Sequence, residues 1–107
     1  MNDNTEISMD LLYEAILCLK TKEECAEFFS DLCTPLELSS ISQRLVVAKL
    51  LGDRKVYSTI ARATGASTAT ISRVNRTING KYSGRGYEIV LERLAEKGIE
   101  LDMGDEA

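Results

Sequence analysis

The sequence contains no histidine, no C-x-x-C pair and no long apolar run, and each absence excludes a class of protein. Without histidine, the chain lacks the commonest acid-base catalyst and a frequent zinc ligand. It also lacks a nucleophile elbow and the G-x-x-x-x-G-K-[ST] order of a phosphate-binding loop. We therefore expect no enzyme activity, no catalytic residue, no metal ion and no cofactor.

The three cysteines, Cys18, Cys25 and Cys33, are odd in number and have no histidine to complete a zinc site. They are predicted to be reduced, buried and structural. A redox-sensing thiol is the alternative, but such a thiol needs cationic neighbours, and the residues around Cys25 are net acidic.

The longest apolar run, from Ala15 to Leu19, is too short to cross a bilayer. Asp3, Glu6 and Asp10 precede it, where a signal peptide would carry positive charge. These features predict a cytoplasmic protein with no membrane partner. With 107 residues, 44% of them hydrophobic, the chain can bury one modest core, so we expect a single domain over residues 1–107.

The segment from Ile60 to Arg76 has the residue pattern of a helix-turn-helix. Ala61 is small enough to let a second helix cross closely, and Gly65 supplies the positive φ of a tight turn. After the turn, apolar residues recur at helical spacing and would bury one face of a second helix. These residues are Ile71, Val74 and Ile78. Short, polar and basic residues fall on the opposite face: Ala69, Ser72, Arg73 and Arg76.

Basic residues are concentrated around this segment. Between Ile41 and Tyr87, nine lysines and arginines stand against one acid, Asp53, which gives the segment a net charge of +8. Because the whole chain carries −4, the remainder carries −12. Phosphates are bound by clustered cations on one module, so this distribution favours double-stranded DNA as the partner.

Helical signals recur along the rest of the chain, and strand signals are nearly absent. A first amphipathic helix is expected from about Met9 to Lys20. Thr21 and Glu24 form a capping box that opens a second helix, and Thr34-Pro35-Leu36-Glu37 opens a third that Gly52 ends. The predicted organisation is dimerisation helices over 9–52, a helix-turn-helix over 56–78, a loop over 79–86, a C-terminal helix over 87–98 and an acidic tail over 99–107.

The first two helices have apolar faces that must be covered. Because operator symmetry often mirrors protein symmetry, a homodimer that uses these helices as its interface is the expected solution.

The stretch from Gly65 to Arg73, and more loosely the chain from Cys33 to Arg76, resembles the tryptophan repressor (TrpR) family. The resemblance is closer to its TrpR-like subgroup called YerC/YecD. It implies an all-α, multihelical intertwined homodimer in which each chain presents one helix-turn-helix. It also implies a sequence-specific DNA-binding regulator of transcription, most simply a repressor, that reads the major groove.

Residue matching to the family implies roles for two sets of residues. Thr68, Ala69 and Ser72 match groove-facing positions of the reading helix, while Val56, Tyr57 and Ser58 match the start of the preceding helix, where phosphate is bound. Arg76 and Lys81 are expected to act through charge. The predicted DNA-binding residues are Thr68, Ala69, Ser72, Arg73, Arg76, Lys81, Arg54, Lys55, Tyr57 and Ser58.

The family's effector pocket is matched in part. Arg44 matches an arginine that stacks on the indole of tryptophan, Arg73 matches one that faces the ligand, and Thr77 replaces a serine. Val74 stands where the tryptophan-responsive repressor has glycine, and its branched side chain would occupy the indole slot. We therefore predict that tryptophan is not a corepressor and that binding is ligand-independent or uses a smaller anionic effector.

Other functions stay open. A non-specific architectural DNA-binding protein would bind all duplexes equally at fixed salt. A protein-interaction module would use the same small residues for packing alone. The reading domain of replication initiators is a further relative, although this chain shows no nucleotide-binding partner domain.

Overall fold

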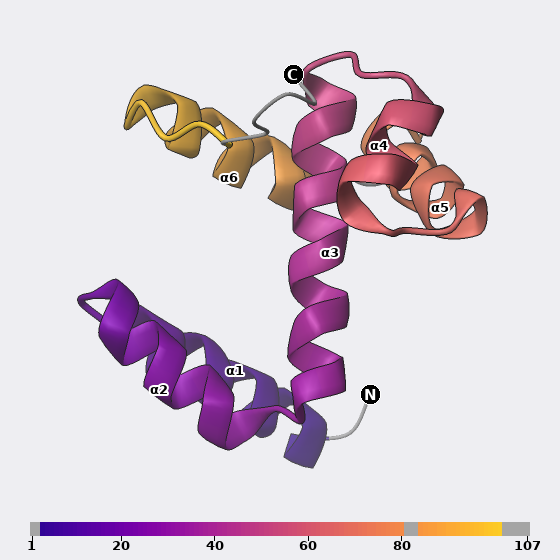
Figure 1. Ribbon diagram of the computed structural model, residues 1–107. Coiled ribbons are helices and arrows are strands. Elements are labelled where there is room, and N and C mark those ends of the chain that lie inside the picture. The colour runs from indigo at the N-terminus through magenta and orange to yellow at the C-terminus, as the bar shows by residue number, and fades with distance from the viewer. Residues whose placement is uncertain (1–2, 81–83, 102–107) are drawn as a thin grey trace. The chain divides into compact units, whose positions relative to one another are not determined.

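The computed structural model describes residues 3–80 and 84–101 (Figure 1). In these ranges the chain forms six helices and no strand, which confirms the all-α fold. The helices are α1 (Asp3–Leu17), α2 (Lys22–Leu32), α3 (Pro35–Gly52), α4 (Tyr57–Thr64), α5 (Thr68–Asn79) and α6 (Arg85–Glu96). Over the same ranges, no helix has both the length and the apolar character needed to cross a membrane. The chain divides into two compact units, residues 1–38 and 39–107.

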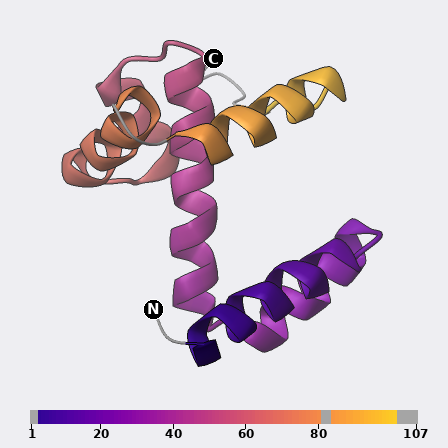
Figure 2. The ribbon, with the colours of Figure 1, turned by 180° about the vertical axis from the view of Figure 1, so that it is seen from behind.

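The first unit contains a helical hairpin, since the ribbon reverses direction between α1 and α2 (Figures 1 and 2). The predicted capping box opens α2. The Oγ1 atom of Thr21 accepts a hydrogen bond from the amide of Glu24 at 3.0 Å. The Glu24 carboxylate in turn accepts one from the amide of Lys20 at 2.8 Å. These bonds satisfy amides that a helix start would leave without a partner.

The predicted limits of the first helix were wrong, because α1 begins at Asp3 and ends at Leu17. The prediction followed the apolar stripe alone. Once a helix is nucleated, each further residue adds one backbone hydrogen bond, so polar residues extend it without burying a side chain. The hydroxyl of Ser8, for example, donates to the carbonyl of Asn4 within this extension. The predicted segment 9–52 is therefore helical from residue 3.

None of the side chains described in the first unit is fully buried. Leu11, Leu17 and Leu36 are 69%, 79% and 81% exposed. The three cysteines are free thiols, but Cys18 is exposed and the other two are half-buried. The prediction that they are buried is wrong for the single chain, because a hairpin of two helices has no second layer to enclose them.

The core lies in the second unit, where the C-terminal half of α3 meets α4 and α5. Ile60, Ile71 and Val74 are fully buried, and Ala61 and Ile78 pack against them, as the helical spacing predicted. Burial of one such aliphatic side chain contributes about 1.5–3 kcal/mol. In both views, α4 and α5 lie on one side of α3 and α6 on the other (Figures 1 and 2). The buried residues are Val47, Ala48, Leu50, Ile60, Ala66, Ile71 and Val74.

Two glycines of this unit end helices in the left-handed conformation. Gly65, with a φ of 73°, closes α4, and its amide donates to the carbonyl of Ala61 at 2.8 Å. Gly98, also with a φ of 73°, follows α6, and the next amide, that of Ile99, reaches back to the carbonyl of Leu94 at 3.0 Å. Both use the positive φ that glycine adopts without strain.

The end of α3 departs from the predicted pattern. Gly52 is its last residue, as expected, but the left-handed residue is Arg54, with a φ of 64°. The amides of Arg54 and Lys55 donate to the carbonyls of Leu51 and Leu50, each at 3.0 Å, which is a Schellman motif with arginine in the position that glycine usually takes.

The segment between α5 and α6 is shorter than the predicted loop over 79–86, and residues 81–83 lie outside the described residues. α5 continues through Asn79, and α6 runs from Arg85 to Glu96 rather than over 87–98. The glycines predicted a loop, but Gly84 is the N-cap of α6. A Cβ atom on Gly84 would lie 2.7 Å from the carbonyl oxygen of Thr77, so glycine is needed where α6 approaches α5.

Candidate nucleic-acid interface

α5 presents a short, polar and basic face to solvent. Its inner face is held in the core through Ile71 and Val74. The outer face combines two arginines with small side chains, so the helix backbone can approach base edges while the guanidinium groups reach phosphates. The predicted residues of this face are exposed, apart from half-buried Ser72: Thr68, Ala69, Ser72, Arg73 and Arg76.

Hydrogen bonds fix the turn that precedes α5. The hydroxyl of Thr64 donates to the carbonyl of Ile60 at 2.7 Å and accepts from the amide of Ala66 at 3.1 Å. The side-chain oxygen of Ser67 accepts from the amide of Thr70, also at 3.1 Å, and caps α5. The side-chain amide of Gln43, on α3, donates to the carbonyl of Thr64 at 3.1 Å. This part-buried bond ties the turn to α3.

The junction between α3 and α4 carries the other predicted phosphate-binding residues. Arg54 is exposed and Lys55 half-buried, and Tyr57 and Ser58 form the exposed start of α4. The N-cap residue of α4, Val56, makes no side-chain cap hydrogen bond. A helix N-terminus without a competing side-chain acceptor can donate its first amides to a phosphate and favours negative charge.

Lys49, in the last turn of α3, is held between two carboxylates. Its Nζ atom lies 3.1 Å from each carboxylate oxygen of Asp53 and 3.3 Å from Oε2 of Glu100. The hydrogen bond to Asp53 is the main cause of a raised pKa at Lys49, and Glu100 adds to it. The ammonium is therefore fully protonated near neutral pH.

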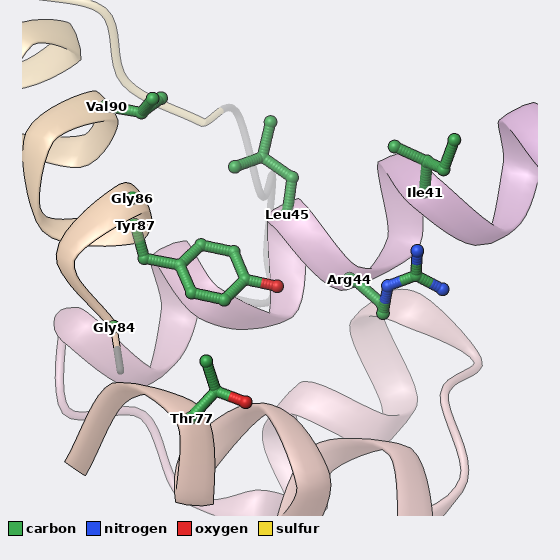
Figure 3. Close-up of a pocket in the computed structure, with 8 residues that line it drawn as sticks. All are labelled: Ile41, Arg44, Leu45, Thr77, Gly84, Gly86, Tyr87 and Val90. Atoms are coloured by element: carbon green, nitrogen blue, oxygen red, sulfur yellow. The ribbon is translucent and has the colours of Figure 1, made fainter. Parts of the chain in front are cut away.

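A groove of about 550 Å³ lies between α3 and α6 above the end of α5 (Figure 3). The Tyr87 ring extends from α6 across the groove, with its hydroxyl directed toward the α3 side, where Arg44 stands. The Nη1 atom of Arg44 donates to the hydroxyl of Ser40 at 3.0 Å. The described residues that line the groove are Ile41, Arg44, Leu45, Thr77, Gly84, Gly86, Tyr87 and Val90.

The four residues predicted for an effector pocket do not all meet in this groove. Arg44 and Thr77 line it, whereas Arg73 and Val74 are not among its lining residues. Val74 is 2% exposed and packs in the core, and Arg73 is exposed on the outer face of α5. Among the described residues that line the groove, Arg44 is the one arginine, so these residues do not include a pair that could sandwich an aromatic ring.

Sequence reasoning missed several residues of this region. Gln43 has no spacing signal that relates it to the turn, and Lys49 and Glu100 are 51 residues apart. Tyr87 was not among the residues predicted for a binding site. Lys81, the last predicted phosphate-binding residue, lies outside the described residues.

Comparisons with known proteins agree on one family. The family model described as Trp repressor protein matches residues 7–95. A Bacillus subtilis (strain 168) protein described as uncharacterized protein YerC is 49% identical over 92 residues, which are 86% of each chain. The crystal structure of a TrpR-like protein from Eubacterium eligens is 51% identical, with a TM-score of 0.77 over 82% of this chain and 89% of that one. A solved Staphylococcus aureus structure is 40% identical, with a TM-score of 0.77 over 95% and 100%.

Proposed function

Because this chain belongs to the Trp repressor family, in its YerC-like subgroup, we propose that it is a sequence-specific transcriptional regulator, and a repressor, that reads the major groove with α5. The family is one of DNA-binding regulators rather than enzymes. One observation carries the finer proposal. The outer face of α5 exposes small and basic side chains, while its inner face is anchored in the core by Ile71 and Val74. This is the arrangement that a recognition helix requires.

Phosphate contacts are assigned to the junction between α3 and α4. Arg54 and Lys55 supply charge, and the start of α4 at Tyr57 and Ser58 supplies amides and hydroxyls. Such contacts position a protein on the duplex without reading sequence. Base preference then comes from Thr68, Ala69 and Ser72, whose short side chains permit close approach.

The working form is proposed to be a homodimer. The first unit has no fully buried side chain among those described, and it exposes many large apolar residues, more than a stable monomer leaves to water. Helices of two copies would form a shared core and make residues 1–107 one domain. The apolar residues it exposes are Ile7, Met9, Leu11, Tyr13, Ile16, Leu17, Leu32 and Leu36.

DNA binding is proposed to be independent of tryptophan. The groove between α3 and α6 contains Arg44 and Thr77 but not Arg73. The described residues of this groove therefore do not provide two arginines between which an indole could stack.

Selection of bound sites from a random pool of duplex DNA tests this function. The expected result is a two-fold symmetric motif with half-sites about one helical turn apart, bound at least about a thousandfold more tightly than random duplex at equal salt. Equal affinity for the selected and random DNA would instead favour a non-specific architectural protein, and no DNA binding would overturn the proposal.

Arg76→Ala serves as the control in this experiment. Because phosphate contacts release counterions whatever the base sequence, the variant should bind all duplexes more weakly and lower the salt slope by about one. The same result is expected for Lys81→Ala.

A further inference from the structure

Two asparagines on successive turns of α5 lie along one edge of its outer face. The side-chain amide of Asn79 donates through Nδ2 to Oδ1 of Asn75 at 2.8 Å. Asn79 is exposed and Asn75 is half-buried. At about 100° per residue, Asn79 falls about 20° and Asn75 about 60° from Ser72, on the same side as Thr68. The pair therefore borders the face that α5 is proposed to turn toward DNA.

Helix formation does not explain the amide at Asn75. This residue is the eighth of the 12 residues of α5, well inside the helix. Asparagine is a weak helix former there, because its side chain competes for the hydrogen bonds of the backbone. A side-chain hydrogen bond between residues four apart stabilises a helix only slightly. The contribution of Asn75 to folding is therefore a weak reason for its presence.

The bond from Asn79 orients the Asn75 amide and leaves both of its polar atoms able to bind a ligand. A carbonyl oxygen has two lone pairs, so Oδ1 of Asn75 can accept a second hydrogen bond. Nδ2 of Asn75 is bonded to no described residue. Asn75 thus presents one donor and one acceptor side by side, in an order that Asn79 sets.

This order matches the edge of adenine in the major groove. Adenine presents the acceptor N7 next to the N6 amino group, and an asparagine side chain can bond to both at once. Guanine presents two acceptors, N7 and O6, so the Asn75 oxygen would face O6 with no hydrogen between them. The Asn75 amide therefore favours adenine and disfavours guanine at the same base pair.

We propose that Asn75 reads an adenine in each half-site and that Asn79 is the positioning residue that holds its amide. This inference rests on the proposed function and deepens it, because it adds a base-specific contact to the same helix. Asn75 lies seven residues from Thr68, about 10 Å along the helix axis. Successive base pairs are only about 3.4 Å apart, so the adenine belongs to a different base pair from the one beside Thr68.

Site selection from random duplex DNA tests the base contact when the unmodified protein is compared with Asn75→Ala. Alanine is the better helix former, so this variant keeps the fold. The unmodified protein should select an adenine in each half-site, and guanine in its place should lower the affinity about tenfold to a hundredfold. Asn75→Ala should lose the preference at that base pair and keep the rest of the motif. Arg76→Ala is the matched control on α5 and should bind more weakly with every base preference unchanged.

A modified base tests the contact at the level of one atom. When 7-deazaadenine, which lacks the N7 acceptor, replaces the selected adenine, the unmodified protein should bind about tenfold more weakly. The affinity of Asn75→Ala should not change, because this variant has no amide that could donate to N7. An equal loss in both proteins would show that another group reads N7 and would overturn the assignment to Asn75.

The part played by Asn79 is measured as the ratio of the affinities for the adenine and guanine duplexes. Asn79→Ala should lower this ratio, because the Asn75 amide is then free to turn over. Asn79→Gln keeps an amide donor and should restore part of the ratio. A residue that only supports the helix would change both affinities equally, so an unchanged ratio in Asn79→Ala would overturn the positioning role.

The outcomes separate this inference from the function on which it rests. If Asn75→Ala keeps the adenine preference, or binds all duplexes equally more weakly, the base contact is overturned and the DNA-binding function stands. If the unmodified protein binds selected and random duplexes with equal affinity, or binds no DNA, both proposals fail.

Discussion

At the scale of single residues, Arg54 is the described non-glycine residue with a positive φ, and it lies among the proposed phosphate contacts. Left-handed backbone costs an L-residue about 1–2 kcal/mol, and glycine in its place costs about 0.5–1 kcal/mol through the greater freedom of the unfolded chain. Arg54→Gly should therefore stabilise the fold by about 0.5–1 kcal/mol. Because a cation is lost, DNA affinity should fall and the salt slope should drop by about one.

Urea unfolding at fixed protein concentration and a salt series on random duplex measure the two effects of Arg54→Gly. Arg85→Gly, at an exposed position of α6 with ordinary φ, is the comparison, since it should lose stability. A loss of stability in Arg54→Gly of the same size would show that the conformation carries no strain.

Ala69 is predicted to set sequence preference, because it is small and exposed on the outer face of α5. Ala69→Phe should change which sites are selected from random DNA and leave the melting temperature nearly unchanged, since a ring at this position would meet base edges and not the core. Ala95→Phe, at an exposed position of α6, is the matched control and should leave the selected sites as they were. Unaltered sites with retained binding in Ala69→Phe would show that the groove face is wrongly assigned.

Val74 is predicted to matter for stability and not for a tryptophan response. Val74→Gly removes a buried isopropyl group and puts glycine inside a helix, a loss of about 2–4 kcal/mol. Calorimetry with millimolar tryptophan should show no saturable binding to either protein, because Arg73 does not line the groove that holds Arg44. Saturable binding that also raises DNA affinity would contradict this prediction.

For single residues, sequence reasoning succeeded where helical periodicity alone decides whether a side chain is buried or exposed. The periodicity that starts at Ile71 correctly placed Val74 in the core and Arg73 outside it, because both follow from about 100° per residue. It could not predict the hydrogen bond between Gln43 and Thr64, nor that Arg44 lines the groove while Arg73 is not among its lining residues, since both depend on the angle between helices. The residue roles in DNA binding stay predictions.

At the scale of helices, local capping was readable from the sequence because it involves residues only three or four apart. Around Pro35, the amide of Glu37 donates to Oγ1 of Thr34 at 3.1 Å, and the amide of Thr34 donates to the Glu37 carboxylate at 2.8 Å. The limits of α1, which lack such a signal, were predicted less well, whereas the end of α3 at Gly52 was predicted correctly. At the ends of α1, backbone cooperativity and the following turn set the limits.

The capping box of α3 makes a prediction about pH. The hydrogen bond from the Thr34 backbone amide is the main cause of a lowered pKa at Glu37, and the hydrogen bond with the Thr34 side chain lowers it further. A carboxyl group whose pKa is lower in the folded than in the unfolded protein stabilises the fold when it is ionised. This stabilisation is fully present above the unfolded-state pKa and is lost as the pH falls through the folded-state pKa. Unfolding by urea from about pH 7 to about pH 3 should therefore show a smaller acid loss in Glu37→Gln than in the unmodified protein.

Thr34→Ala is the companion variant of that experiment. It should cost about 1 kcal/mol at neutral pH, because the amide of Glu37 loses its acceptor. If the free energy of unfolding of Glu37→Gln and of the unmodified protein fell equally with pH, the Glu37 carboxylate would not contribute to the pH dependence of stability.

At the scale of the whole molecule, the two units differ in how they could be stable. The second unit has a buried core that joins α3, α4 and α5, whereas the first exposes large apolar side chains on α1. The sequence predicted the apolar stripe of α1 and a second copy of the chain as its cover, and the face that would enclose the stripe is absent from a single copy. A dimer in which the first units share a core would account for both observations.

The last prediction concerns that dimer. Leu12→Glu with Ile16→Glu puts two charges on the apolar stripe of α1, where burial of unpaired carboxylates is strongly unfavourable. The variant should sediment as a monomer at micromolar concentration and lose much of its helical circular dichroism, since a unit without a shared core cannot stay folded. Ser8→Glu with Ser30→Glu adds the same charge at exposed polar positions and should stay dimeric. A compact, folded monomer of the unmodified chain in the same experiment would contradict the dimer, because the exposed apolar side chains of α1 would then need no partner.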